Sequence, residues 1–172
     1  MKHLKRYKQL FESISVWHGS TVKFSKFDLD KVGSGDGKNL GGWGFYFSDD
    51  KNVADRYYLK GGSVKEYSIE DGPYFDLDEM LDDNTADEIK RELENRGISE
   101  DAIEQFQTDF VDYIDYGGNT NKQVLDWLEY VMGSPKEASM FLKDLGFIGN
   151  KFEDKWERGS MNYVVFNPDS IQ

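Results

Sequence analysis

The order in which strand-like and helix-like segments follow one another constrains the fold of this chain more than any other feature. Residues 15–70 and 147–167 combine glycine, aromatic and alternating apolar residues, a pattern typical of strands. Residues 73–146 carry apolar stripes at helical spacing instead. Strands, then helices, then strands again indicate the α+β class rather than alternating βαβ units. The predicted strands are Ser15–Trp17, Gly44–Ser48, Val64–Glu70, Phe147–Phe152 and Met161–Asn167.

Helix-capping residues divide the middle segment into several helices. Asn84 or Thr85 is expected to cap a helix that runs through Asn95, and Ser99 to cap the next one. Pro135 is expected to begin the last helix, because proline fits the first turn but not the interior. We therefore predict one domain over residues 15–172, with a helical insertion at about residues 76–146 and an arm or short helix at residues 1–14.

The acidic residues are concentrated in the first part of this insertion. The whole chain has a net charge of -12, and residues 71–115 alone hold 16 acids against three bases. The rest of the chain is therefore close to neutral and offers no basic face for a nucleic-acid duplex. We interpret the acidic block as a solvated helical face, and its alternative is a surface that docks a basic partner.

The residues that the chain lacks exclude several kinds of site. It has no cysteine, which excludes disulfides, thiolate zinc sites and a cysteine nucleophile. Its two histidines, His3 and His18, argue against a histidine-rich metal site. Residues 1–14 contain no continuous apolar run, so neither a secretory signal nor a membrane span is expected there. We expect no metal, no membrane contact and a cytoplasmic location.

Two short motifs carry the residues best suited to chemistry. The first is Trp17-His18-Gly19-Ser20, and the second is Gly44-Phe45-Tyr46-Phe47-Ser48-Asp49, with Ala54 and Tyr57 on a following helix. A glycine-rich loop at residues 31–43, expected to be mobile, separates them. Together they resemble the ADP-ribosyltransferase family, in the histidine–tyrosine branch shared by diphtheria-type toxins and poly-ADP-ribose polymerases. The likeness is greatest to small domains of phage polyvalent proteins.

The tail of the chain agrees with this resemblance. Leu145–Phe152 and Asn162–Pro168 are similar to the closing strands of those domains, so the likeness runs from Ser15 to Ile171 without the helical middle. The resemblance implies split antiparallel β-sheets and NAD as the substrate. The first residues also resemble the starts of proteins from large tailed phages, which would make this a phage protein with a toxin-like domain, acting in the host cytoplasm.

The resemblance also implies a role for each motif residue. His18 would bond a ribose hydroxyl, and Gly19 and Ser20 would pair with the nicotinamide carboxamide. Only small residues permit that close approach. Tyr46 and Tyr57 would stack on the nicotinamide, since aromatic faces suit a cationic ring. No metal is required.

One departure from the family pattern bears on catalysis. Where the polymerase-like members place a glutamate, this chain has Asn162, whose amide cannot act as a general base. Synthesis of a polymer is therefore not expected. The nearest acids are Glu153, Asp154 and Glu157, of which Glu157 is our first choice for the missing carboxylate. A second departure is Ile148, where the phage domains tend to have aspartate.

Three functions are compatible with these residues. The leading hypothesis is a mono-ADP-ribosyltransferase that moves ADP-ribose from NAD to an unknown protein or nucleic-acid acceptor. The second is an NAD glycohydrolase, in which water is the acceptor. The third is a catalytically weak NAD-binding or interaction module whose acidic insertion docks a basic partner. Asn162 favours the last two, and the intact His18, Tyr46 and Tyr57 favour the first.

Overall fold

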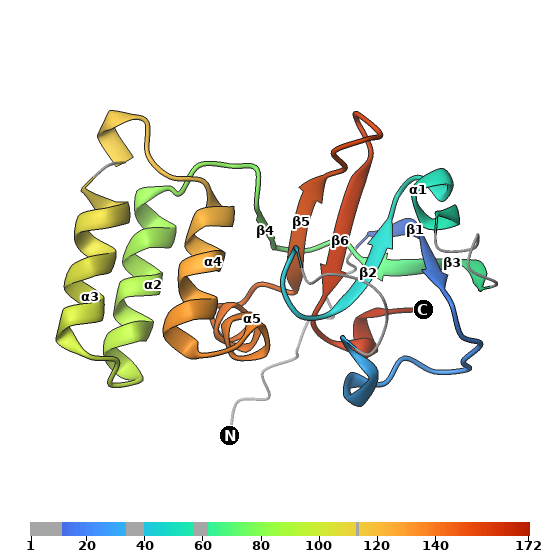
Figure 1. Ribbon diagram of the computed structural model, residues 1–172, viewed down its shortest axis with the longest axis horizontal. Coiled ribbons are helices and arrows are strands. Elements are labelled where there is room, and N and C mark those ends of the chain that lie inside the picture. The colour runs from blue at the N-terminus through green and yellow to red at the C-terminus, as the bar shows by residue number, and fades with distance from the viewer. Residues whose placement is uncertain (1–11, 34–39, 57–61, 113) are drawn as a thin grey trace, which may run out of the picture.

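The computed structural model describes residues 12–33, 40–56, 62–112 and 114–172, which form a β-sheet with a group of helices beyond one of its edges (Figure 1). The strands are β1 (Ser13–Ser20), β2 (Phe45–Ser48), β3 (Ser63–Glu70), β4 (Tyr74–Asp76), β5 (Gly149–Glu153) and β6 (Met161–Val165). The helices are α1 (Lys51–Asp55), α2 (Asp83–Asn95), α3 (Glu100–Phe106), α4 (Asn121–Met132) and α5 (Pro135–Asp144). The expected α+β class is confirmed.

The six strands form one sheet in the order β3-β1-β2-β6-β5-β4. Neighbouring strands are antiparallel except β4 and β5, so the sheet is mixed rather than purely antiparallel. The helical insertion is the reason, because parallel strands need a long crossover and α2–α5 provide it between β4 and β5. β4 itself lies in the segment that the sequence pattern assigned to helices.

The sheet is nearly divided between β1 and β2. β1 pairs with β3 along its whole length, from Ser13↔Glu70 to Ser20↔Ser63. Its register with β2 is the single pair Trp17↔Ser48. The expected split into two sheets therefore takes the form of one sheet with a weak junction, which we call the β1–β2 seam.

Two hydrophobic cores lie on different parts of the molecule. The larger one joins α2–α5 to the β4–β5 edge, and it includes Phe75, Ile89, Leu93, Phe106, Leu125, Leu128, Phe141 and Leu142. The smaller one covers one face of the sheet and consists of Val16, Phe45, Phe47, Ile69, Tyr163 and Val165. Figure 1 shows α2–α5 at the opposite end of the molecule from β1 and β3. The helical insertion therefore packs mainly on itself.

The helix boundaries follow the capping signals with one exception. α2 is capped by Asp82, whose carboxylate accepts from the N–H of Thr85, and not by Asn84 or Thr85 as expected. An ionised carboxylate at this position also interacts favourably with the helix dipole. Ser99 caps α3 as expected. Pro135 begins α5 as expected.

Candidate functional site

His18 lies on β1 beside the seam, and the main chain of β2 fixes its ring. The Nδ1 atom of His18 lies 2.7 Å from the carbonyl oxygen of Tyr46. Because a carbonyl oxygen can only accept, Nδ1 carries the proton and donates it. The neutral ring therefore presents Nε2 as an acceptor that can take a hydrogen bond from a ligand hydroxyl.

Aromatic rings surround the His18 imidazole and favour its neutral form. Their centroids lie between 5.3 and 6.3 Å from that of His18, and they belong to Phe24, Phe27, Phe47 and Tyr67. Burial among these rings lowers the pKa of His18 from its ordinary value of 6.5, and the hydrogen bond to the β2 carbonyl opposes the shift only in part. His18 is therefore uncharged at neutral pH, as an acceptor must be.

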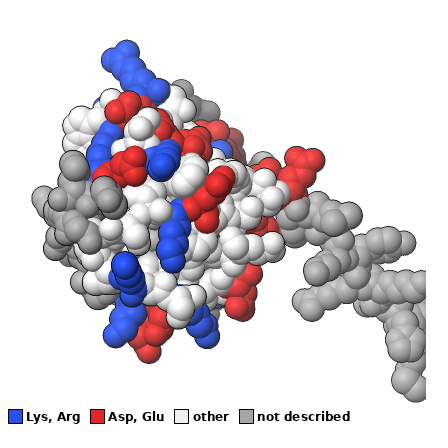
Figure 2. All heavy atoms as spheres, turned by 90° about the vertical axis from the view of Figure 1, so that its right-hand side faces the viewer, with Lys and Arg blue, Asp and Glu red and all other residues white. Residues whose placement is uncertain are grey.

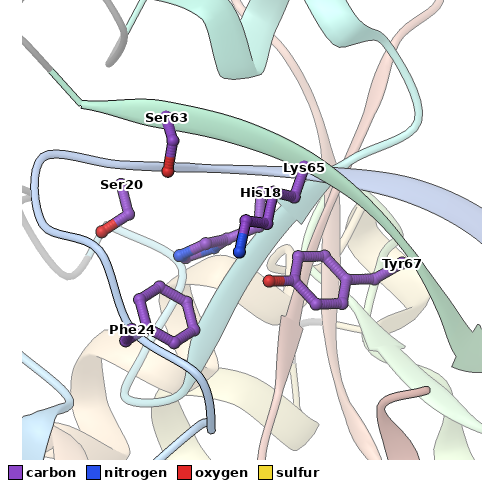
Figure 3. A pocket seen from close by; sticks show the side chains of 6 residues that line it. All are labelled: His18, Ser20, Phe24, Ser63, Lys65 and Tyr67. Carbon is purple, nitrogen blue, oxygen red and sulfur yellow. The ribbon is translucent and has the colours of Figure 1, made fainter.

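A small pocket opens next to His18 on the face shared by β1 and β3 (Figure 3). It is lined by His18, Ser20, Phe24, Ser63, Lys65 and Tyr67. The strand register explains the grouping, since His18 pairs with Lys65 and Ser20 with Ser63, and paired residues share a face. The pocket thus combines an imidazole, three hydroxyls and an ammonium, groups that bind sugar hydroxyls and phosphates.

The sequence motifs pointed to two of these six residues, His18 and Ser20. Ser63, Lys65 and Tyr67 were missed because only the pairing of β3 with β1 brings them to the motif. The alternation within β3 showed that they share a face, but no local signal showed which strand they join. Gly19 pairs with Val64 on the same two strands, so its backbone lies beside the pocket.

The side chain of Tyr46 lies on the opposite face of the sheet from that of His18. Trp17 pairs with Ser48, and side chains alternate along a strand, so Tyr46 shares the face of Trp17 and Ser48. The Tyr46 hydroxyl donates to the carbonyl of Gly42 at 2.7 Å and accepts from the N–H of Gly41 at 3.1 Å. His18 and Tyr46 are thus joined through the main chain, and a ligand touching both side chains has to cross the seam.

The described end of the glycine-rich loop, residues 40–43, is anchored to the rest of the protein. Asn150 donates to the carbonyl of Gly41 at 2.6 Å, and the N–H of Trp43 donates to Ser139 at 3.0 Å. Gly42 has a φ of +95°, where a side chain would be strained. Residues 34–39 of the loop lie outside the described residues. The anchored part fixes the position from which Tyr46 enters β2.

Asn162 lies on β6, on the same face of the sheet as Tyr46. It pairs with Ser48, and its Nδ2 donates to Oδ2 of Asp154 at 3.2 Å. Since β1, β2 and β6 are neighbours in the sheet, His18, Tyr46 and Asn162 occupy three consecutive strands. The three residues singled out from distant parts of the sequence are therefore close in space.

Asp154 is the acid that contacts Asn162, and it is only 7% exposed in the turn between β5 and β6. It also accepts from the N–H groups of Trp156 and Glu157, both at 2.9 Å, and from Nη1 of Arg56 at 3.1 Å. Burial by itself raises the pKa of Asp154, but these hydrogen bonds outweigh it and hold the pKa below its usual range. Asp154 is therefore a structural anion, poorly suited to accept a proton.

The two other acids of this turn are more exposed. Glu157, our first choice for the catalytic carboxylate, is 49% exposed and forms an ion pair with Arg56 at 3.3 Å. Glu153 is exposed and accepts from the N–H of Gly159 at 2.7 Å. The sequence could not show which of the three acids is buried, because burial of Asp154 depends on how the turn closes.

Helix α1 lies over the face that carries Tyr46 and Asn162. At its start, Nζ of Lys51 lies 5.2 Å from the ring centroid of Trp17, and just after its end Arg56 reaches Asp154. The side chains of Lys51 and Arg56, at the two ends of α1, therefore reach β1 and the β5–β6 turn. Ala54 lies in α1 as expected, whereas Tyr57, expected to stack on nicotinamide, lies outside the described residues.

The described part of the chain contains no cluster of three or more His, Cys, Asp or Glu side chains that could hold a metal ion. It also contains no helix long and apolar enough to cross a membrane. Figure 2 shows the end of the molecule that carries β1, β3 and α1, where basic and acidic side chains are interspersed and neither sign forms a broad patch.

Comparison with known families gives one match. The model for the family described as "ADP-Ribosyltransferase in polyvalent proteins" matches residues 12–172 of this chain. No curated protein and no solved structure matches.

Proposed function

Because the chain belongs to the family of ADP-ribosyltransferase domains found in polyvalent proteins, we propose that it binds NAD and transfers a single ADP-ribose group to a macromolecular acceptor. The observation that carries this proposal is the placement of His18, Tyr46 and Asn162 on the neighbouring strands β1, β2 and β6. A substrate that contacts the side chains of both His18 and Tyr46 would have to reach both faces of the sheet at the β1–β2 seam.

The reaction makes clear demands on such a site. The bond between ribose C1′ and the nicotinamide nitrogen breaks, and its electron pair leaves with nicotinamide, which becomes neutral. The sugar carries positive charge at C1′ until a lone pair of the acceptor forms the new bond, after which the acceptor loses its proton. The protein must therefore hold the ribose, orient the leaving ring and place partial negative charge near C1′.

The described residues can meet these demands from both faces. Nε2 of His18 would accept a hydrogen bond from a ribose hydroxyl, since Nδ1 is committed to the Tyr46 carbonyl. Lys65, with the hydroxyl of Ser63, would hold the diphosphate. On the other face, the ring of Tyr46 would pack against nicotinamide and the amide of Asn162 would contact its ribose. Gly19, Ser20 and Tyr57 keep the roles that the family resemblance implies.

The site lacks a well-placed general base, which limits the acceptor chemistry. Asn162 cannot take up a proton, and the low pKa of Asp154 makes that carboxylate a poor base. The remaining candidates are Glu153 and Glu157, of which Glu157 stays our first choice. We therefore propose mono-ADP-ribosylation of an acceptor that is already a good nucleophile, not polymer synthesis.

The lack of a well-placed base also supports the two alternatives, an NAD glycohydrolase and a catalytically weak NAD-binding module. A site without a base still binds and polarises NAD, and water is the default acceptor. In a binding module, the acidic face of α2 and α3 would dock a basic partner. The cytoplasmic location, the phage origin and the independent folding of the insertion remain predictions.

Incubation of the protein with labelled NAD and a cell lysate distinguishes these functions, when free nicotinamide and labelled macromolecules are both measured. Transfer labels macromolecules and releases nicotinamide, hydrolysis releases nicotinamide alone, and a binding module does neither. Asn162→Glu restores the carboxylate of the polymerase-like pattern and should raise nicotinamide release by about a hundredfold. Asn95→Glu makes the same chemical change at the far end of α2 and should have no effect.

Each outcome bears on the proposal. Failure of the wild-type protein to bind NAD in a calorimetric titration would refute it. Binding without any nicotinamide release, from either the wild type or Asn162→Glu, would replace the enzyme with the binding module.

A further inference from the structure

We propose that Asp154 is a positioning residue that fixes the orientation of the Asn162 amide, so that its oxygen, and not its NH2 group, faces the bound ribose. This inference rests on the proposed function, because it concerns the same NAD site. It explains how an asparagine can take the place of a carboxylate there.

The hydrogen bond between the two residues sets the orientation. Nδ2 of Asn162 lies 3.2 Å from Oδ2 of Asp154. An ionised carboxylate only accepts, so the end of the amide that faces it must be the NH2 group. The Oδ1 atom of Asn162 then points away from Asp154, and within the described residues it has no hydrogen-bond partner of its own.

Asp154 is itself held firmly enough to impose this orientation. Its Oδ1 accepts from the N–H groups of Trp156 and Glu157 and from Arg56. Its own N–H donates to the carbonyl of Ser160 at 2.8 Å. Oδ1 is thus fixed by the turn and by Arg56, and Oδ2 accepts from Asn162 at 3.2 Å and from Arg56 at 3.4 Å. A group so fully occupied orients its neighbour and does not take part in proton transfer.

The consequence is electrostatic. The amide oxygen carries partial negative charge, and the NH2 group carries partial positive charge. An oxygen turned toward the ribose can accept from a hydroxyl and stabilises positive charge at C1′, whereas an NH2 group there would oppose that charge. The orientation of one amide therefore changes the sign of the field at the reacting carbon.

A pair of variants tests the orientation directly. In Asp154→Asn, the new amide still accepts from the turn with its oxygen and presents NH2 to Asn162, so the Asn162 amide should rotate and turn its own NH2 toward the ribose. In the double variant Asp154→Asn with Asn162→Asp, the amide at position 154 donates to the carboxylate at position 162, whose second oxygen again faces the ribose. Both variants remove the same carboxylate from Arg56, so a difference between them does not come from the loss of that ion pair. The single variant Asn162→Asp shows how much of the difference comes from the new carboxylate at position 162 itself.

We expect three results. In nuclear magnetic resonance spectra of the unliganded protein, the Asn162 side-chain NH2 protons should exchange slowly with solvent in the wild type and faster in Asp154→Asn. Nicotinamide release by Asp154→Asn should fall by about tenfold or more while NAD affinity changes much less. The double variant should recover release to at least the wild-type rate. Asp144→Asn, the same change at an exposed residue of α5, should leave all three measurements unchanged.

The inference is overturned if the exchange of the Asn162 amide is the same in the wild type and Asp154→Asn, or if the double variant is no faster than the single one. If the wild-type protein binds NAD but releases no nicotinamide, the variants are compared by their NAD affinity instead. The single variant should then bind NAD more weakly than the wild type, and the double variant should regain the wild-type affinity. If the wild-type protein does not bind NAD, the proposed function itself is refuted before any variant is made. Failure of the proposed function is therefore distinguishable from failure of the orientation inference.

Discussion

The hydroxyl of Tyr46 should contribute to stability independently of any ligand. It bridges two buried backbone groups, the carbonyl of Gly42 at 2.7 Å and the N–H of Gly41 at 3.1 Å. Tyr46→Phe keeps the ring but leaves both groups without this partner. A lost hydrogen bond that leaves a buried group unsatisfied costs about 1 kcal/mol or more. Loss of both hydrogen bonds should therefore lower the free energy of unfolding by about 2 kcal/mol.

That loss is large enough to measure in a thermal melt. For a domain of this length, a change of about 2 kcal/mol in the free energy of unfolding lowers Tm by about 6 °C. Tyr130→Phe is the matched control, because Tyr130 is 82% exposed and its hydroxyl can bond water in both states. A Tyr46→Phe protein that melts within about a degree of the wild type would show that the bridge is not a stabilising one. NAD affinity should fall further in Tyr46→Ala than in Tyr46→Phe, since only the first removes the ring.

Three other measurements address the site and its frame. NAD affinity should be constant at neutral pH and fall only as the pH drops through the lowered pKa of His18, which lies below 6.5, because protonation of His18 removes the Nε2 acceptor. Folding stability should fall in the same direction but from a higher pH, since below pH 6.5 the unfolded chain takes up a proton that the folded chain resists. Gly44→Ala should destabilise the protein strongly, because the new Cβ would lie 2.7 Å from the backbone oxygen of Val165. Gly72→Ala should destabilise it less, because its Cβ would meet only the end of a flexible side chain. Equal melting points of the two variants would refute this reasoning. Hydrogen exchange should show no added protection at residues 84–115 when NAD binds, because α2 and α3 pack away from the seam, and strong protection there would contradict it.

The sequence by itself determined most of the local structure. The alternation in Val64–Glu70 identified β3, and Ser99 and Pro135 marked the starts of α3 and α5 correctly. These features depend on residues a few positions apart, so a single chain carries the whole signal. β4 was missed because three residues are too few to show a period.

The motif residues were also recognisable from the sequence, but their relation was not. Only the tertiary structure decides that His18 and Tyr46 meet through a main-chain bond with their side chains on opposite faces of the sheet, because register depends on pairing between distant segments. The same holds for Asp154. In the sequence, Asp154 is one of three acids close together, with Glu153 and Glu157. Only the closure of the β5–β6 turn buries its side chain, surrounds it with donors and turns it toward Asn162. Residue types alone show which chemical groups a site can contain. The burial and orientation of those groups depend on contacts between segments that are far apart in the sequence.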